Sequence, residues 1–115
     1  MKISNNILVG VAMPIYCEFY SKIHDYIYNL NKSYKDKFND DYTLMGLIVF
    51  HDDSNIYEEF FVQHNDIITK YSFTSNIIKR AKTENEPTVV SEKQMTNEIK
   101  THKYVFDIDY FISNK

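Results

Sequence analysis

The sequence predicts a small α/β domain: a βαβ unit within a mostly parallel sheet, with an antiparallel edge strand and helices packed on the sheet. Three observations support this fold class. Ile7–Met13 is a nearly continuous apolar run, which is typical of a buried strand. Residues 15–38 carry apolar side chains at steps of three and four, the spacing of an amphipathic helix. Thr43–Phe50 is a second apolar run, and strand, helix, strand in this order predicts two parallel strands.

The residues between these elements agree with this order. Pro14 suits the first turn of a helix, where its missing N–H is not needed. Asn39–Tyr42 contains residues that favour a turn before the second strand. The apolar stripe of the helix, which we expect to pack on the sheet, consists of Ile15, Phe19, Ile23, Tyr26, Ile27, Leu30 and Tyr34.

Shorter elements are predicted in the middle of the chain. His51–Asn55 is a polar turn, and Ile56–Val62 is a third strand at or near an edge, joined to the second strand as a hairpin. His64–Tyr71 fits either a short helix, capped by Asn65 or Asp66, or a loop. Residues 74–83 begin with Thr and Ser and then carry spaced apolar residues, which predicts a helix.

The C-terminal third predicts a strand, a helix and a strand. Thr88–Val90 is a short apolar stretch after Pro87. Ser91 and Gln94 have the spacing of a capping box, which indicates that a short helix begins there. Residues 103–112 alternate in a way that favours a closing strand, with Tyr104 and Phe106 on one face.

Length and composition limit the class of protein. The chain has 115 residues, which is the size of one domain spanning residues 1–115, and a single cysteine, which favours a reducing compartment such as the cytoplasm. No apolar run reaches the roughly 18 residues of a membrane span, and the first residues lack the cleavage site of a signal peptide. The net charge is −3 and Arg80 is the only arginine, which disfavours nucleic-acid binding.

The order of elements resembles a von Willebrand factor type A (vWA) domain. The resemblance covers about residues 6–83 and rests on "LMGLIVFHDDSNIYEEFF" followed by "FTSNIIKRA", in which Thr74 stands where the family has a threonine at the start of a helix. It implies an α/β fold. The metal-ion-dependent adhesion site of that family, with its Asp-x-Ser-x-Ser motif, would fall near Met13–Cys17, where no such oxygen ligands occur. We therefore expect a degenerate domain with no metal and no cofactor there.

Two places in the sequence suggest chemistry. His51, Asp52 and Asp53 follow a predicted strand, and an imidazole with two carboxylates can bind a metal or transfer protons. A polar turn explains the same residues and is the favoured interpretation. A small metal-dependent hydrolase is the alternative hypothesis. Cys17 lies at the predicted start of a helix, but the sequence indicates neither a base nor an oxyanion hole for it.

The favoured function is a non-catalytic protein-binding module. Acidic residues would gather at one end of the sheet if the βαβ unit is correct, and some aromatic side chains would be exposed beside them, which suits a partner protein with a basic surface. One form of this hypothesis is a phage or plasmid inhibitor of a host defence protein. The candidate partner-binding residues are Asp40, Asp41, Asp52, Asp53, Glu58, Glu59, Tyr28, Phe60 and Phe61.

Overall fold

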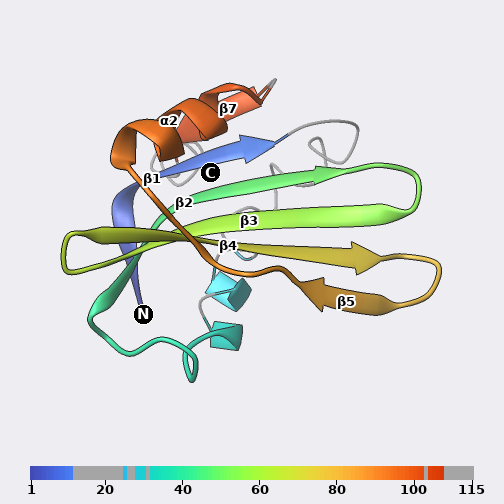
Figure 1. The fold of residues 1–115 in the computed structure, drawn as a ribbon, viewed down its shortest axis with the longest axis horizontal. Helices are drawn as coiled ribbons and strands as arrows, with labels where there is room; N and C mark the ends of the chain where they lie inside the picture. Colours follow the sequence, from blue (N-terminus) through green and yellow to red (C-terminus); the bar gives the residue numbers. More distant parts are fainter. Residues whose placement is uncertain (12–24, 26–27, 31, 103, 108–115) are drawn as a thin grey trace.

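A computed structural model of the chain describes residues 1–11, 25, 28–30, 32–102 and 104–107. These residues form a seven-stranded sheet with the order β5-β4-β3-β2-β1-β7, and β6 also pairs with β4 (Figure 1). The elements are β1 (Lys2–Val11), β2 (Tyr42–His51), β3 (Asn55–His64), β4 (Ile67–Asn76), β5 (Ala81–Glu84), β6 (Thr88–Val90), α2 (Glu92–Lys100) and β7 (Tyr104–Asp107).

The predicted fold class is wrong, because the described chain is mostly β-sheet and its strands are mostly antiparallel. The pair β1–β2 is parallel, as the sequence predicted, but β2–β3, β3–β4, β4–β5, β4–β6 and β1–β7 are all antiparallel. Three consecutive hairpins therefore build most of the sheet. The α/β fold that the vWA resemblance implied is not the fold observed.

The predicted long helix lies mostly outside the described residues. Residues 25, 28–30 and 32–33 are helical, and the residues from Tyr34 to Lys37 form turns. The main-chain N–H of Tyr34 still donates to the carbonyl oxygen of Leu30 at 3.1 Å, as in a helix. Pro14, Cys17 and Ile23 lie outside the described part, and the predictions for them stay predictions.

The largest local errors concern residues 74–83, predicted as a helix, and His64–Tyr71, predicted as a short helix or a loop. His64 pairs with Ile67 across a turn of only two residues, Asn65 and Asp66, and Asn65 has the positive φ of 55° that such a turn needs. β4 then pairs with β3 over ten residues, so Thr74 lies in a strand and does not begin a helix. Ile77 and Ile78 stand in the turn that follows β4, and Ala81 pairs with Asn76 in the β4–β5 hairpin, so their helical spacing does not produce a helix.

Four of the other predictions hold. The hairpin of β2 with β3 is present, and β6 spans the predicted residues Thr88–Val90. Ser91 is the N-cap of α2, where its side-chain oxygen accepts a hydrogen bond from the main-chain N–H of Gln94 at 3.0 Å. β7 confirms the closing strand over Tyr104–Asp107, and residues 108–112 of that prediction lie outside the described part.

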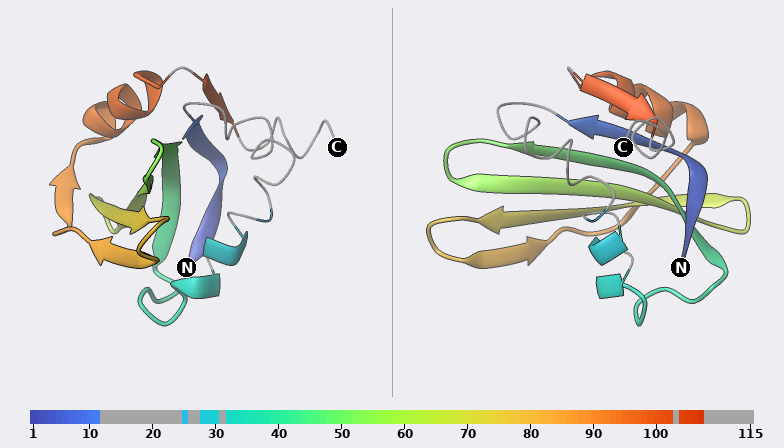
Figure 2. Two further views of the ribbon diagram at one scale, coloured as in Figure 1. Left: turned by 90° about the vertical axis from the view of Figure 1, so that its right-hand side faces the viewer. Right: turned by 180° about the vertical axis from the view of Figure 1, so that it is seen from behind.

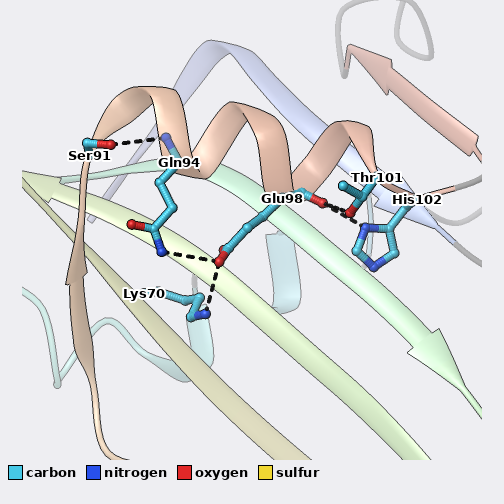
Figure 3. A network of polar contacts seen from close by, with 6 residues as sticks. All are labelled: Lys70, Ser91, Gln94, Glu98, Thr101 and His102. Carbon is cyan, nitrogen blue, oxygen red and sulfur yellow. Dashed lines mark hydrogen bonds and ion pairs between the residues drawn. The ribbon is translucent and has the colours of Figure 1, made fainter.

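Both faces of the sheet are covered, and each has its own core (Figure 2). Phe60 is fully buried on the face that residues 30–38 cover, and Phe61 is fully buried on the face that α2 covers. Successive strand residues point to opposite faces, which explains why two adjacent phenylalanines serve two cores. An apolar pattern on both faces also hides the alternation that identifies a half-exposed strand.

The chain's two glycines allow α2 to approach the sheet closely. A Cβ atom on Gly10 would lie 3.1 Å from the carbonyl oxygen of Ile99, and one on Gly46 would lie 2.6 Å from Cδ1 of the same residue. Glycine within a strand often marks such a close approach. Ile99 is fully buried between the helix and the sheet, so these two positions fix the depth at which α2 packs.

Candidate functional site

The turn between β2 and β3 is organised by the Asp52 carboxylate. Its Oδ1 accepts hydrogen bonds from the main-chain N–H groups of Ser54 at 2.8 Å and Asn55 at 2.7 Å, and its Oδ2 accepts one from the Tyr57 hydroxyl at 2.9 Å. The Ser54 and Asn55 amides, followed by the Tyr57 hydroxyl, lower the pKa of Asp52 because they stabilise its charged form. Asp52 is therefore a turn-forming residue whose two oxygens already have donors.

Among the described side chains, no three His, Cys, Asp or Glu groups lie close enough to hold a metal ion. The side chain of His51 and all of Cys17 are outside that description, so the predictions for them stay predictions. Asp53 is exposed at the tip of the turn. The turn interpretation of this stretch accounts for the contacts that Asp52 makes.

The turn between β4 and β5 lies at the same end of the sheet as the Asp52 turn (Figure 1). Asn76 Oδ1 accepts a hydrogen bond from the main-chain N–H of Lys79 at 2.7 Å, and Asn76 Nδ2 donates to Asn55 Oδ1 at 3.2 Å. The main-chain N–H of Ile77 donates to the carbonyl oxygen of Ser54 at 2.8 Å. Because these bonds join the two turns, each turn holds the other in place.

This second turn displays large apolar side chains to solvent. Ile77 is 49% exposed and Ile78 is 76% exposed, and the next two residues, Lys79 and Arg80, are exposed cations. Arg80 has a φ of 51°, an uncommon conformation for a residue with a side chain, and it closes the turn before β5 begins. The backbone of this turn therefore holds two neighbouring isoleucine side chains exposed to solvent.

The strands that follow form the edge of the sheet along β4. β5 pairs with the C-terminal part of β4 and β6 with its N-terminal part, and the N–H of Asn85 donates to the carbonyl oxygen of Ser72 at 3.0 Å between them. Phe73 pairs with Glu84 and Lys70 pairs with Thr88. Three steps along β4 therefore correspond to four steps along the edge, which has one extra residue, as in a bulge. Within the described chain, no strand pairs with the outer side of β5 or β6.

We call Ile77–Val89 the edge segment. Every residue of it is exposed, and Val89 near its end is 69% exposed. Its charges are ordered along the chain: the cations Lys79, Arg80 and Lys82 come first, and the anions Glu84 and Glu86 follow. Apolar residues stand at both ends of this charged stretch.

Aromatic rings and ion pairs hold the middle of the edge segment against the rest of the fold. Lys82 Nζ donates to the Tyr34 hydroxyl at 2.8 Å and lies 4.6 Å from the centre of the Phe73 ring. Glu84 forms an ion pair with Lys37. Burial lowers the pKa of Lys82, but the hydrogen bond to Tyr34 and nearby negative charges outweigh burial and raise it. Lys82 therefore stays positively charged.

Next to Lys82 is a shallow pocket of about 190 Å³, lined by Asn29, Leu30, Ser33, Tyr34, Glu58 and Lys82. Its volume is below the roughly 300–1,000 Å³ that is usual for a small-molecule site. The Tyr34 hydroxyl and Lys82 inside it already bond to each other. These properties favour a feature of the surface over a substrate site.

The acidic candidates do not gather at one end of the sheet. Asp40 and Asp41 come just before β2 and Asp52 and Asp53 just after it, so ten residues, about 30 Å of strand, separate the two pairs. Glu58 lines the shallow pocket. Its neighbour Glu59 points to the opposite face of the sheet, because successive strand residues alternate.

Among the aromatic candidates, Tyr28 is 58% exposed, whereas Phe60 and Phe61 are fully buried. The sequence does not indicate the edge segment, because it predicts a helix over residues 74–83 and a separate short strand at Thr88–Val90. Two signals mark it in retrospect: Asn76 just before two adjacent isoleucines, and the block of cations followed by a block of anions.

Comparison with family models, with curated proteins and with solved structures finds no match to this chain. Within the described residues, no helix is both long enough and apolar enough to cross a membrane.

Proposed function

We propose that this protein is a non-catalytic protein-binding module that binds its partner through the edge segment, Ile77–Val89. The observation that carries this proposal is the display of Ile77 and Ile78, 49% and 76% exposed, on a turn fixed by hydrogen bonds. Single exposed apolar residues are normal on protein surfaces, but contiguous ones often mark interaction sites.

The rigidity of the turn supports a binding role. Association costs free energy when loops must be ordered at the interface, and a turn held in advance avoids much of that cost. Here Asn76 fixes the turn from within and Ser54 fixes it from the neighbouring hairpin. The two isoleucines can therefore enter an apolar site on a partner with little further ordering of the backbone.

The charges of the edge segment suggest what a partner must offer. Glu84 and Glu86 suit a partner with basic groups, while Lys79 and Arg80 suit acidic groups farther along the same surface. An inhibitor of a host defence protein is one form of this proposal. We do not propose the metal-dependent hydrolase, because the contacts of Asp52 are those of a turn-forming residue.

Affinity capture from the source cells tests this function. The tagged protein is compared with a variant carrying Ile77→Ser and Ile78→Ser, and with Tyr28→Ser as a control that removes an exposed aromatic residue elsewhere. We expect the double variant to lose captured protein that the wild type and the control retain. Equal capture by all three would remove the edge segment from the interface.

A further inference from the structure

We propose that the partner of the edge segment is a second copy of this chain, paired antiparallel along β5 and related to the first by a two-fold axis near Thr83. This inference rests on the proposed function, because it names the partner of the same surface. It extends the sheet of one copy into the sheet of the other, a common way for an exposed edge to gain a partner.

The order of charges carries this inference. In an antiparallel pair centred on Thr83, Lys82 lies opposite Glu84 of the second copy, and Glu84 lies opposite its Lys82. Beyond the two ends of β5, the antiparallel direction brings Arg80 of one copy toward Glu86 of the second. A two-fold axis makes every such contact occur twice, so one ordered stretch supplies two pairs of each kind.

The side chains of β5 point the right way for this pairing. Lys82 contacts Tyr34 and Glu84 contacts Lys37, so both lie on the face of the sheet that residues 30–38 cover. In the paired arrangement they meet side by side on that face. Opposite charges directly across an antiparallel pair each contribute roughly 0.2–1 kcal/mol relative to an alanine pair.

The same register places the apolar ends of the edge segment together. Ile77 and Ile78 stand in the turn before β5 and Val89 lies beyond its other end, so the antiparallel direction brings the isoleucines of one copy toward Val89 of the other. Val89 is 69% exposed in the single chain and Ile78 is 76% exposed. Contact between these ends removes from water the apolar surface that each copy exposes.

Charge order also argues for a second copy over an unrelated strand. A peptide of uniform charge is attracted by one half of the edge segment and repelled by the other half. The chain itself, read in the antiparallel direction, presents anions to the cations and cations to the anions. The interface is short, so we expect a weak dimer that forms at high protein concentration.

Sedimentation equilibrium from micromolar to millimolar concentration tests this pairing. The wild type should pass from 13.7 kDa toward twice that mass as concentration rises. Lys82→Glu and Glu84→Lys should each raise the dimer dissociation constant by about tenfold or more, because two attractive pairs become repulsive. The variant carrying both changes restores opposite charges and should dimerise like the wild type. Lys93→Glu, an equal change of charge on exposed α2, is the matched control.

Lys82 and Glu84 also contact Tyr34 and Lys37 within one chain, so folding of each variant is checked by thermal melting. Arg80→Glu, Glu86→Arg and their combination repeat the charge exchange farther from the axis. A wild type that stays at 13.7 kDa throughout would overturn the inference. Dimerisation unaffected by either charge exchange would overturn it too. If the chain is monomeric but captures a different protein through Ile77 and Ile78, the proposed function stands and the second copy is excluded.

Discussion

The main-chain N–H of Ile77 donates a hydrogen bond to the carbonyl oxygen of Ser54 at 2.8 Å, which joins the turn after β4 to the turn after β2. These residues are far apart in the sequence, yet the β3–β4 hairpin brings them to one end of the sheet. Ser54 belongs to the turn that Asp52 organises, and Ile77 begins the turn that displays two isoleucines. The Asp52 turn therefore supports the edge segment from the side.

Asp52→Asn should lower the melting temperature, with a pH dependence set by the lowered pKa of Asp52. Because the pKa of Asp52 is lower in the folded state, its carboxylate stabilises the fold at pH values above the ordinary pKa of 3.8. This contribution is lost as the pH falls through the lower pKa of the folded state. Thermal melts across this range should show the variant converging with the wild type in acid. A difference that persists unchanged at low pH would mean that the charge of Asp52 is not involved.

Gly10→Val should destabilise the fold by about 1–3 kcal/mol, the usual cost of forcing extra atoms into a packed site. The first atom a new Cβ would meet is the main-chain carbonyl oxygen of Ile99, at 3.1 Å, which cannot move without shifting α2. Urea denaturation measures this effect. Gly46→Ala is the comparison and should cost less, since its nearest contact is the flexible end of the Ile99 side chain. Full stability in Gly10→Val would show that α2 does not pack this closely.

Phe61→Ala should cost about 3–5 kcal/mol, because Phe61 is fully buried beneath α2. Tyr28→Ala should change stability by less than about 0.5 kcal/mol, because Tyr28 is 58% exposed. Denaturant melts of both variants give the two free energies of unfolding, and the difference shows which aromatic residue forms part of a core and which is available to a partner. Similar costs for the two changes would contradict the coverage of the α2 face.

Ile78→Ser should leave the free energy of unfolding within about 0.5 kcal/mol of the wild type, because the side chain is 76% exposed. Asn76→Ala, in contrast, removes the acceptor for the Lys79 N–H and a donor to Asn55, so it should lower stability measurably. Urea melts compare the two. If Ile78→Ser proves as costly as Asn76→Ala, the isoleucine packs within its own chain and is not displayed for a partner.

The sequence was a good guide to segments whose pattern is local. The apolar runs predict β2 and β3 within two residues, β6 and the Ser91 cap of α2 at their exact places, and only the C-terminal half of β1. It failed for β4 and β5. Ile77, Ile78 and Ala81 have helical spacing, and only the pairing of β4 with β3 and of β5 with β4 decides against a helix.

The predicted acidic site failed to gather for a related reason. It required the parallel strands of an α/β sheet, whose carboxyl ends meet at one edge. Asp40 and Asp52 instead lie at opposite ends of β2. The burial of both Phe60 and Phe61 likewise depends on coverage of both faces, a property of the whole fold that no local pattern reports.

Amide hydrogen exchange of the edge segment tests the central claim most directly. The exchange rates of residues 77–89 are measured in dilute and in concentrated protein, with β3, which is paired on both sides, as the internal reference. Pairing with a second copy predicts slower exchange at high concentration in β5, around Thr83, with no change in β3. Equal exchange of the edge segment at both concentrations would contradict the pairing of this edge with a second copy.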